Sequence, residues 1–198
     1  MIRLFLTGML LFVFSSSSYS QDLHFGIKAG LNRSNYVGDQ YGDFKARTSF
    51  HVGVFAETPI GGIFSFHPEL LYSRQGGRLA LSPFIVADPG DPVINELPEY
   101  AEFYDNYLQF PLLFRINLGE VFSFELGPQI GISLTNDSRF DFAPVTGLGF
   151  DLGDKFKFQI RYFLGISDIV RSTELGGTTL NDDRFDSVFQ LAAGYVLF

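Results

Sequence analysis

The chain of 198 residues contains no cysteine, no tryptophan and only two methionines. Without cysteine it can form no disulfide scaffold, no thiolate nucleophile and no cysteine-ligated metal site. Charged residues make up 18% of the chain and the net charge is −8, whereas an average soluble domain is roughly 25% charged. Because nucleic-acid phosphates are bound by clustered Lys and Arg, this sparse and acidic charge argues against a nucleic-acid partner.

Phenylalanine and glycine are abundant instead, with 24 Phe and 21 Gly in a chain that is 46% hydrophobic. This hydrophobic content excludes an intrinsically disordered protein. The length corresponds to about one domain. The composition therefore indicates a single, unusually apolar domain.

Residues 1–20 have the pattern of a secretory signal peptide. Arg3 supplies the positive start, residues 4–14 form an apolar run, and Ser20 closes a small-x-small cleavage site. The run is shorter than the roughly 20 apolar residues that a membrane-spanning helix needs. We therefore expect cleavage and export, with residues 21–198 as the mature domain. An uncleaved N-terminal anchor is the alternative.

Apolar residues recur at every second position over long stretches of the mature chain. The stretches are 108–118, 122–134 and 156–166, and the intervening positions include Glu125 and Arg161. Strict alternation predicts strands with one apolar face. Globular strands usually have about 5–6 residues, whereas strands that cross a bilayer have about 9–11. Long alternation of this kind is typical of a transmembrane β-barrel.

The pattern predicts eight strands joined by alternating short and long connectors. The strands are expected near 22–34, 47–58, 63–75, 104–118, 121–134, 142–152, 155–168 and 186–198. Tight turns are expected at Pro59–Gly62, Gly119–Glu120 and Gly153–Asp154, and long loops near 35–46, 76–103, 135–141 and 169–185. Gly76 and Gly77 are expected to break the third strand at its end.

Outer-membrane barrels have short periplasmic turns and long external loops. We therefore predict an all-β protein of the cell outer membrane, an eight-stranded antiparallel transmembrane β-barrel in an up-and-down meander. With an even number of strands, both mature termini are expected in the periplasm. A soluble β-sandwich is the alternative fold.

Short motifs in the predicted strands resemble those of a known family. They read GIKAGLN at 26–32, PELLYS at 68–73, YLQFPLL at 107–113, GPQIG at 127–131, GLG at 147–149 and RY at 161–162. With these motifs the chain resembles the PorT-like family of outer-membrane β-barrel domain proteins. The resemblance implies an outer-membrane barrel. Because the family namesake is linked to secretion, it also implies a role accessory to protein secretion or assembly, in a family of mixed functions.

If the apolar faces meet lipid, the opposite faces fill the barrel. The predicted interior polar network comprises Lys28, His51, Glu57, Glu69, Arg115, Glu125, Gln129, Lys157 and Arg161. Isolated buried charges are costly, so these groups should pair. We expect Arg115 and Arg161 each to contact at least one of Glu57, Glu69 and Glu125. The favoured interpretation is structural, and a proton or small-solute path is the alternative.

The histidines are the main candidates for catalysis. Ser65, His67 and Glu69 share one strand face, but neighbours on a face lie about 6.6 Å apart, so direct hydrogen bonds between them are not expected. His51 is expected near the outer rim. A lipid-modifying or proteolytic enzyme would need a nucleophile or carboxylate beside His51. We expect no enzyme, no catalytic residue, no cofactor and no metal site.

Most acidic residues are expected in the loops, where they form a solvated acidic surface. They are Asp39, Asp43, Asp88, Asp91, Glu96, Glu99, Glu102, Asp105, Glu174, Asp182 and Asp183. The longest loop, 76–103, is the expected contact for a protein partner, because long loops are often functional. We expect a monomer surrounded by outer-membrane lipid, with a non-enzymatic structural or interaction role. A protein partner at the external loops or periplasmic turns is compatible with this role, and a small enzyme or a narrow channel is the alternative.

Overall fold

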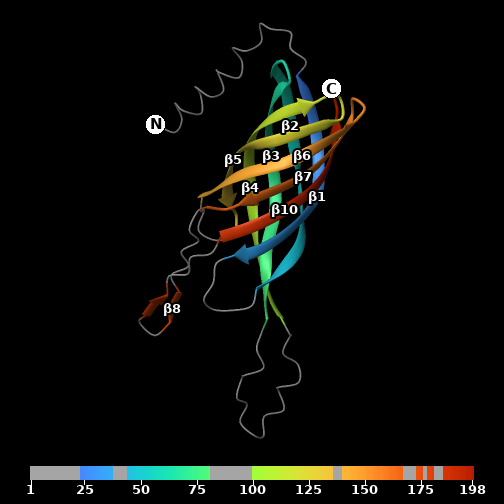
Figure 1. Ribbon diagram of the computed structural model, residues 1–198. Coiled ribbons are helices and arrows are strands. Elements are labelled where there is room, and N and C mark those ends of the chain that lie inside the picture. The colour runs from blue at the N-terminus through green and yellow to red at the C-terminus, as the bar shows by residue number, and fades with distance from the viewer. Residues whose placement is uncertain are drawn as a thin grey trace.

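The computed structural model describes residues 23–37, 44–80, 100–135, 140–166, 173–175, 178–180 and 185–198. In this part of the chain eight antiparallel strands close into a barrel in the order β1-β10-β7-β6-β5-β4-β3-β2 (Figure 1). The barrel strands are β1 (His24–Val37), β2 (Phe44–Gly61), β3 (Phe64–Ala80), β4 (Tyr100–Leu118), β5 (Phe122–Ser133), β6 (Phe140–Leu152), β7 (Phe156–Leu164) and β10 (Phe185–Val196). The predicted eight-stranded up-and-down barrel is therefore confirmed.

Three tight turns lie at one end of the barrel, which we call the turn end. Each contains a glycine with positive φ, namely Gly62 at 58°, Gly119 at 82° and Gly153 at 62°. This backbone conformation is open to glycine and strained for other residues. The first and last strands also meet here, because the Phe25 amide donates to the Phe198 carbonyl at 2.8 Å. The opposite end is called the loop end.

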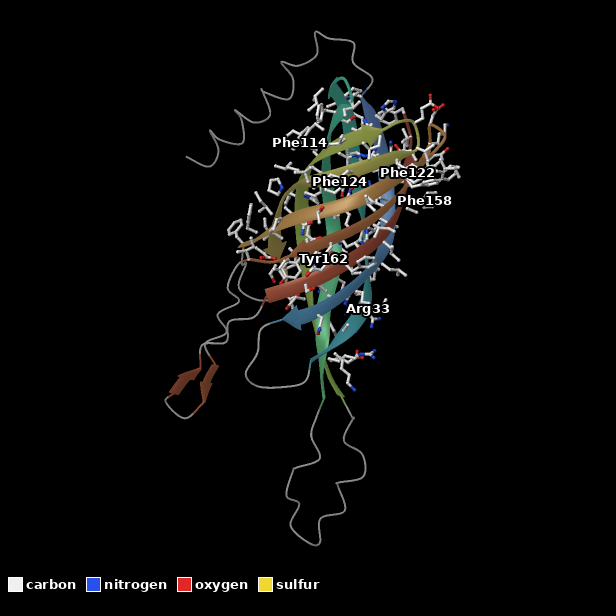
Figure 2. The ribbon with its side chains drawn as sticks, viewed as in Figure 1. Arg33, Phe114, Phe122, Phe124, Phe158 and Tyr162 are labelled. Carbon is white, nitrogen blue, oxygen red and sulfur yellow. The ribbon has the colours of Figure 1, made fainter. Side chains whose placement is uncertain are left out.

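The barrel wall has an apolar outer face, as the alternation predicts. Phe114, Phe122, Phe124, Phe158 and Tyr162 are all exposed on the outside of the barrel (Figure 2). Residues between them on the same strands point inward and are mostly buried. A continuous apolar surface around a closed barrel is suited to lipid and unfavourable in water.

The third and fourth strands are longer than predicted. The ladder of β3 and β4 continues through Gly76–Tyr104 and Gly77–Phe103 to Ala80–Tyr100. The expected strand break at Gly76 and Gly77 is therefore wrong. Gly76 has a φ of 148°, which glycine adopts without a Cβ penalty, so the ladder continues through it. The strands consequently occupy both ends of the predicted loop 76–103.

A gap interrupts the ladder between β2 and β3. Pairing with β3 stops at Ala46 and resumes at His51 with a shifted register. Side chains bond to the backbone of β3 in this region instead, because Asn32 donates to the Arg74 carbonyl at 2.8 Å and Ser34 to the Gly76 carbonyl at 2.6 Å. These two backbone carbonyls of β3 are thus satisfied by side chains of β1, which is the neighbour of β2 in the barrel.

Parts of the predicted loops belong to strands in the structure. Within the predicted loop 169–185, β8 (Thr173–Leu175) and β9 (Thr178–Leu180) form a separate two-stranded sheet. Glu102 and Asp105 lie on β4 and Glu174 lies on β8, so these three acids are not loop residues. The predicted signal peptide and the other predicted loop acids lie outside the described residues. No helix in the described part of the chain is long and apolar enough to cross a membrane.

Candidate functional site

The turn-end half of the barrel interior holds a network of paired charges. Seven strands contribute, because the inward positions of β1 to β7 carry a charge near this level. The cations are Lys28, Arg115, Lys157 and Arg161, and the carboxylates are Glu57, Glu69, Glu125 and Asp151. The network therefore has equal numbers of cations and carboxylates.

Glu69 lies at one side of this network. Its carboxylate accepts two hydrogen bonds from the Arg161 guanidinium, at 2.7 and 2.8 Å. Lys28 Nζ lies 2.9 and 3.0 Å from the same two oxygens and donates to the Gln159 amide oxygen at 2.5 Å. The paired geometry of a guanidinium and a carboxylate is among the strongest that side chains form.

Glu125 connects Arg161 to Arg115. Arg161 Nε donates to one Glu125 oxygen at 2.6 Å, and Arg115 Nε lies 3.2 Å from the other. Both guanidinium groups thus contact one or more of the expected carboxylates, as predicted. Arg115 also donates to Glu57 at 2.7 Å and to Asp151 at 3.0 Å. Lys157 Nζ lies 2.9 Å from Glu57 and 3.0 Å from Asp151, which closes the network at the turn end.

Inward glycines provide the space that the arginines occupy. A Cβ added at Gly149 would lie 2.9 Å from Arg115 Nη2 and would also meet Ser123 Oγ. A Cβ at Gly147 would lie 2.6 Å from Arg161 Cγ. The inward face of β6 is therefore built from small residues because the long side chains of β4 and β7 lie across it.

The charges of this network are paired with one another. Arg115 and Glu125 are fully buried, and taking such ions out of water is unfavourable unless each finds a partner of opposite charge. Every carboxylate in the network has at least one cation within 3.2 Å. A carboxylate held by cations is a poor proton acceptor. The network thus favours a structural role over acid–base chemistry.

Seven of the nine predicted interior residues belong to this network, and His51 and Gln129 do not. His51 Nδ1 lies 2.7 Å from the Asn32 amide oxygen, in a separate uncharged cluster with Ser73 and Gln190. Gln129 is buried beside Ala143 of β6, nearer the loop end. The expected rim position of His51 is wrong, because β2 begins at Phe44 and places His51 within the wall, where it is buried.

Gln159 and Asp151 belong to the network although they are absent from the predicted set, and His67, predicted only to share a strand face with Glu69, also contacts it. His67 Nε2 lies 2.9 Å from Glu69 Oε1, which is closer than the spacing of their backbones on one strand face suggests. Two side chains on one face can lean toward each other even though their backbones are about 6.6 Å apart. Asp151 shares the inward parity of Gly147 and Gly149 on β6 and could have been found from it. Within the described residues no group of three or more His, Cys, Asp or Glu side chains could hold a metal ion.

A small apolar cluster packs inside the barrel on the loop side of the network. Leu113, Val145, Phe163 and Val188 are buried together with Ala143, and they come from β4, β6, β7 and β10. Their inward position interrupts the polar lining that a water-filled passage requires. Toward the turn end the interior thus holds paired charges, and toward the loop end it holds this apolar cluster together with buried uncharged polar side chains such as Asn32, Gln109 and Gln190.

Comparison with known proteins agrees with this architecture. The family described as outer membrane protein beta-barrel domain matches residues 15–171. No curated protein matches the chain. Among solved structures, Neisserial surface protein A has a TM-score of 0.53 at 10% identity, covering 87% of this chain and 97% of that one.

The attachment invasion locus protein Ail of Yersinia pestis, solved with the heparin analogue sucrose octasulfate, has a TM-score of 0.51 at 15% identity. This similarity covers 88% of the present chain and 99% of the Ail chain. At such low identity the two likenesses show the fold alone. Because the family match covers most of the chain and the strands close a lipid-facing barrel, this protein belongs to the outer membrane protein beta-barrel domain family and is located in the outer membrane.

Proposed function

We propose that the protein is a non-enzymatic interaction protein of the outer membrane, accessory to protein secretion or assembly. The PorT-like family that it resembles in sequence supports this assignment. The single structural observation that carries it is a raised strand edge at the loop end.

The raised edge belongs to β4. Pairing of β4 with β5 ends at Tyr107–Ser133, whereas pairing with β3 continues to Ala80–Tyr100. Leu134, just after β5, still donates to the Asn106 carbonyl at 2.7 Å. Residues 100–105 therefore extend the wall by roughly 20 Å along the strand at the usual rise per residue. In Figure 1 these paired strands extend beyond the other barrel strands. Short turns are periplasmic in this class of protein, so the raised edge is on the external side.

The free side of this edge is a docking surface of a known type. Among the described residues, no strand pairs with β4 from Tyr100 to Tyr104 on the side away from β3. An unpaired edge presents backbone donors and acceptors to which an extended segment of another protein can add as a strand. This supports an interaction role at the cell surface.

The filled interior supports a role other than solute passage. The charge network links inward side chains of seven strands, and buried side chains such as Phe163 and Gln109 occupy the interior beyond it. We expect planar-bilayer recordings of the purified protein to show no discrete conductance. Reproducible single-channel steps that disappear when the barrel is unfolded would favour a narrow channel instead.

The positions of the described histidines favour a non-enzymatic role. His51 bonds to the Asn32 amide rather than to a hydroxyl or carboxylate, and His67 is buried beside Glu57 and Glu69 beneath the apolar cluster. Neither of these two histidines is at the rim of the loop end, where a lipid or peptide substrate would arrive. The third described histidine, His24, is exposed but begins β1 at the opposite, turn end. We expect no hydrolysis of phospholipid or peptide substrates by the refolded protein.

A site-specific photocrosslinker tests the docking edge directly. We would place it at Ala101 on the edge and, as a control, at Phe124 on the lipid-facing side of β5. Capture of a distinct protein at position 101 but not at 124 in intact cells is the expected result. No captured protein at 101, or the same products at both positions, would contradict the docking edge.

The secretion role needs a separate cellular test. A strain that lacks the protein should export less cargo, and the wild-type gene should restore export. Residues 81–99 can be replaced with Asn-Gly, which favours a tight hairpin turn. The shortened protein should still fold as a barrel, which a gel shows by different migration before and after boiling. Unchanged secretion in the deletion strain would exclude the proposed pathway.

A further inference from the structure

The backbone of β4 faces its two neighbouring strands in alternation. The Asn106 amide donates to Thr135 Oγ1 at 2.8 Å, and the Asn106 carbonyl accepts from the Leu134 amide at 2.7 Å. Both backbone polar groups of Asn106 therefore point toward β5, and in an antiparallel strand this direction repeats at every second residue. The even-numbered residues of 100–104 thus direct their amides and carbonyls to the β5 side, and the residues between them face β3.

The connection from β5 to β6 is too short to cover this edge. The ladder of these two strands ends at Ile132–Phe140, and Thr135 is the last described residue after β5. Four residues connect Thr135 to Phe140, and four residues span at most roughly 14 Å. The edge from Tyr100 to Asn106 is roughly 20 Å long. In the described part of the chain no strand accepts the amides and carbonyls that the even-numbered positions offer.

The outer face beside this edge accommodates an aromatic side chain. Tyr104 is 44% exposed, and the guanidinium carbons of Arg74 and Arg47 lie 4.0 and 4.8 Å from its ring centre. These arginines belong to β3 and β2, which lie on the side of β4 opposite the free edge. Aromatic pairs on facing strands stabilise a sheet. An added strand is therefore most stable when an aromatic residue lies opposite Tyr104.

Glu102 limits the charge of a segment that fits. Its carboxylate lies 3.0 Å from both the Arg47 and the Arg78 guanidinium groups. A carboxylate opposite Glu102 would meet a like charge, which destabilises a cross-strand pair. A cation in the same place would meet the two guanidinium groups. A neutral polar residue is compatible with both, so it is the residue type expected two positions from the aromatic residue.

A second copy of this chain fits this edge less well. Two copies in one membrane have the same orientation, so their β4 strands run in the same direction and can pair only as parallel strands. Parallel pairing is slightly less stable per residue. Because both copies lie at the same height in the membrane, it would also bring their Glu102 residues together as like charges.

We propose that residues 100–104 bind an extended, uncharged segment of another protein as an added antiparallel strand, with an aromatic residue opposite Tyr104. This inference rests on the docking role proposed above and names the chemistry of the partner. Each segment residue opposite an even-numbered position exchanges two backbone hydrogen bonds with it. The partner is thus recognised through alternate amides and one ring pair, as an extended chain rather than as the surface of a folded domain.

Synthetic peptides test the proposal on the purified protein in detergent. The parent probe is a fluorescent peptide with blocked ends, in which three threonines flank a central tyrosine on each side. One derivative is N-methylated at the tyrosine and at the residues two positions from it, and the other at the residues between. Fluorescence anisotropy should show the first derivative binding about tenfold or more weakly, because the amides that face the edge no longer donate. The second should bind like the parent.

A pair of variants tests the same hydrogen bonds from the side of the protein. Glu102→Pro removes an amide of the free edge and leaves the amides that face β3, since proline is tolerated where the N–H of an edge strand faces solvent. Glu102→Ala is the matched control, because it removes the same carboxylate and keeps the amide. The proline variant should bind the parent peptide about fivefold more weakly than the alanine variant. Different gel migration before and after boiling shows that both variants fold.

Four outcomes would overturn the proposal. They are no binding of the parent peptide, equal binding of the two N-methylated peptides, equal binding by two folded variants, and a dimer of the purified protein that Glu102→Pro dissociates. Binding that occurs only after residues 81–99 are shortened would assign the edge to this chain's own loop, and so would also contradict it. A protein captured at Ala101 without a difference between the two peptides would keep the docking role and exclude strand addition.

Discussion

Individual glycines determine whether the interior arginines fit inside this narrow barrel. Arg115 donates to Ser123 at 2.7 Å and lies against Gly149, which has no side chain to displace it. By contrast, a Cβ at Gly131 would meet its nearest neighbour, Asp141 Cβ, at 3.5 Å. Two inward glycines on neighbouring strands thus face different constraints.

Alanine substitutions distinguish these two sites. Gly149→Ala should lower the free energy of unfolding by about 1–3 kcal/mol, because overpacking shifts Arg115 and Ser123. Gly131→Ala should stay close to wild type, since 3.5 Å is an ordinary van der Waals contact. Urea unfolding in lipid vesicles measures both. Equal effects at the two positions would show that Arg115 is not held against Gly149.

The Glu69 carboxylate contacts two buried cations, Lys28 and Arg161. Glu69→Gln keeps the shape of the side chain but leaves Lys28 and Arg161 with one fewer buried carboxylate. Breaking a buried pair in this way destabilises by about 3–5 kcal/mol. Glu120→Gln in an exposed turn is the control and should have no measurable effect. A loss below about 1 kcal/mol on removing the Glu69 charge would contradict the importance of the pair.

Among the strands, the β2–β3 pair is held together differently from the others. Where its ladder is interrupted, Asn32 donates to Ser73 and to the Arg74 carbonyl and accepts from Gln190 at 3.0 Å. The contact between these strands therefore depends on side chains of β1 as well as on backbone pairing.

Removing the Asn32 amide should loosen this gap. Asn32→Ala is expected to lower stability by about 1–3 kcal/mol, because it leaves buried donors and acceptors without partners. Amide hydrogen exchange should become faster around Arg74 and Gly76. Thr48→Ala, an exposed position on β2 beside the gap, should leave exchange unchanged. Unaltered exchange in Asn32→Ala would show that the Asn32 side chain does not hold β3 there.

The number of strands could be predicted from the sequence, but the gap could not. Alternation over residues 122–134 and glycine turns such as Gly119 are local signals, and they placed β5 within a residue at each end. The gap depends on Asn32 meeting Arg74, which are distant in sequence and meet only after the barrel closes. The contact between His67 and Glu69 could not be predicted either. Their side chains lean toward each other, although the spacing of their backbones on the strand suggested separation.

As a whole molecule, the protein has two unlike sides. The β5–β10 side has short strands and an uncharged outer face, while the β1–β4 side is taller and carries the raised edge of β4. The interior is filled in both halves. The abundance of Phe and Gly follows from this architecture, because Phe lies on the lipid face and Gly lies at turns and beside the interior arginines.

The central claim is that successive residues of each strand face lipid and the filled interior in turn. The absence of native cysteine allows single cysteines to be placed at each position of β5 from Phe122 to Ser133 and labelled with a nitroxide. Collision with oxygen, which concentrates in hydrocarbon, should be high at even-numbered positions and low at odd-numbered ones. The account predicts this period of two along the whole strand. Uniform oxygen access, or high access at positions 125 and 129, would contradict it.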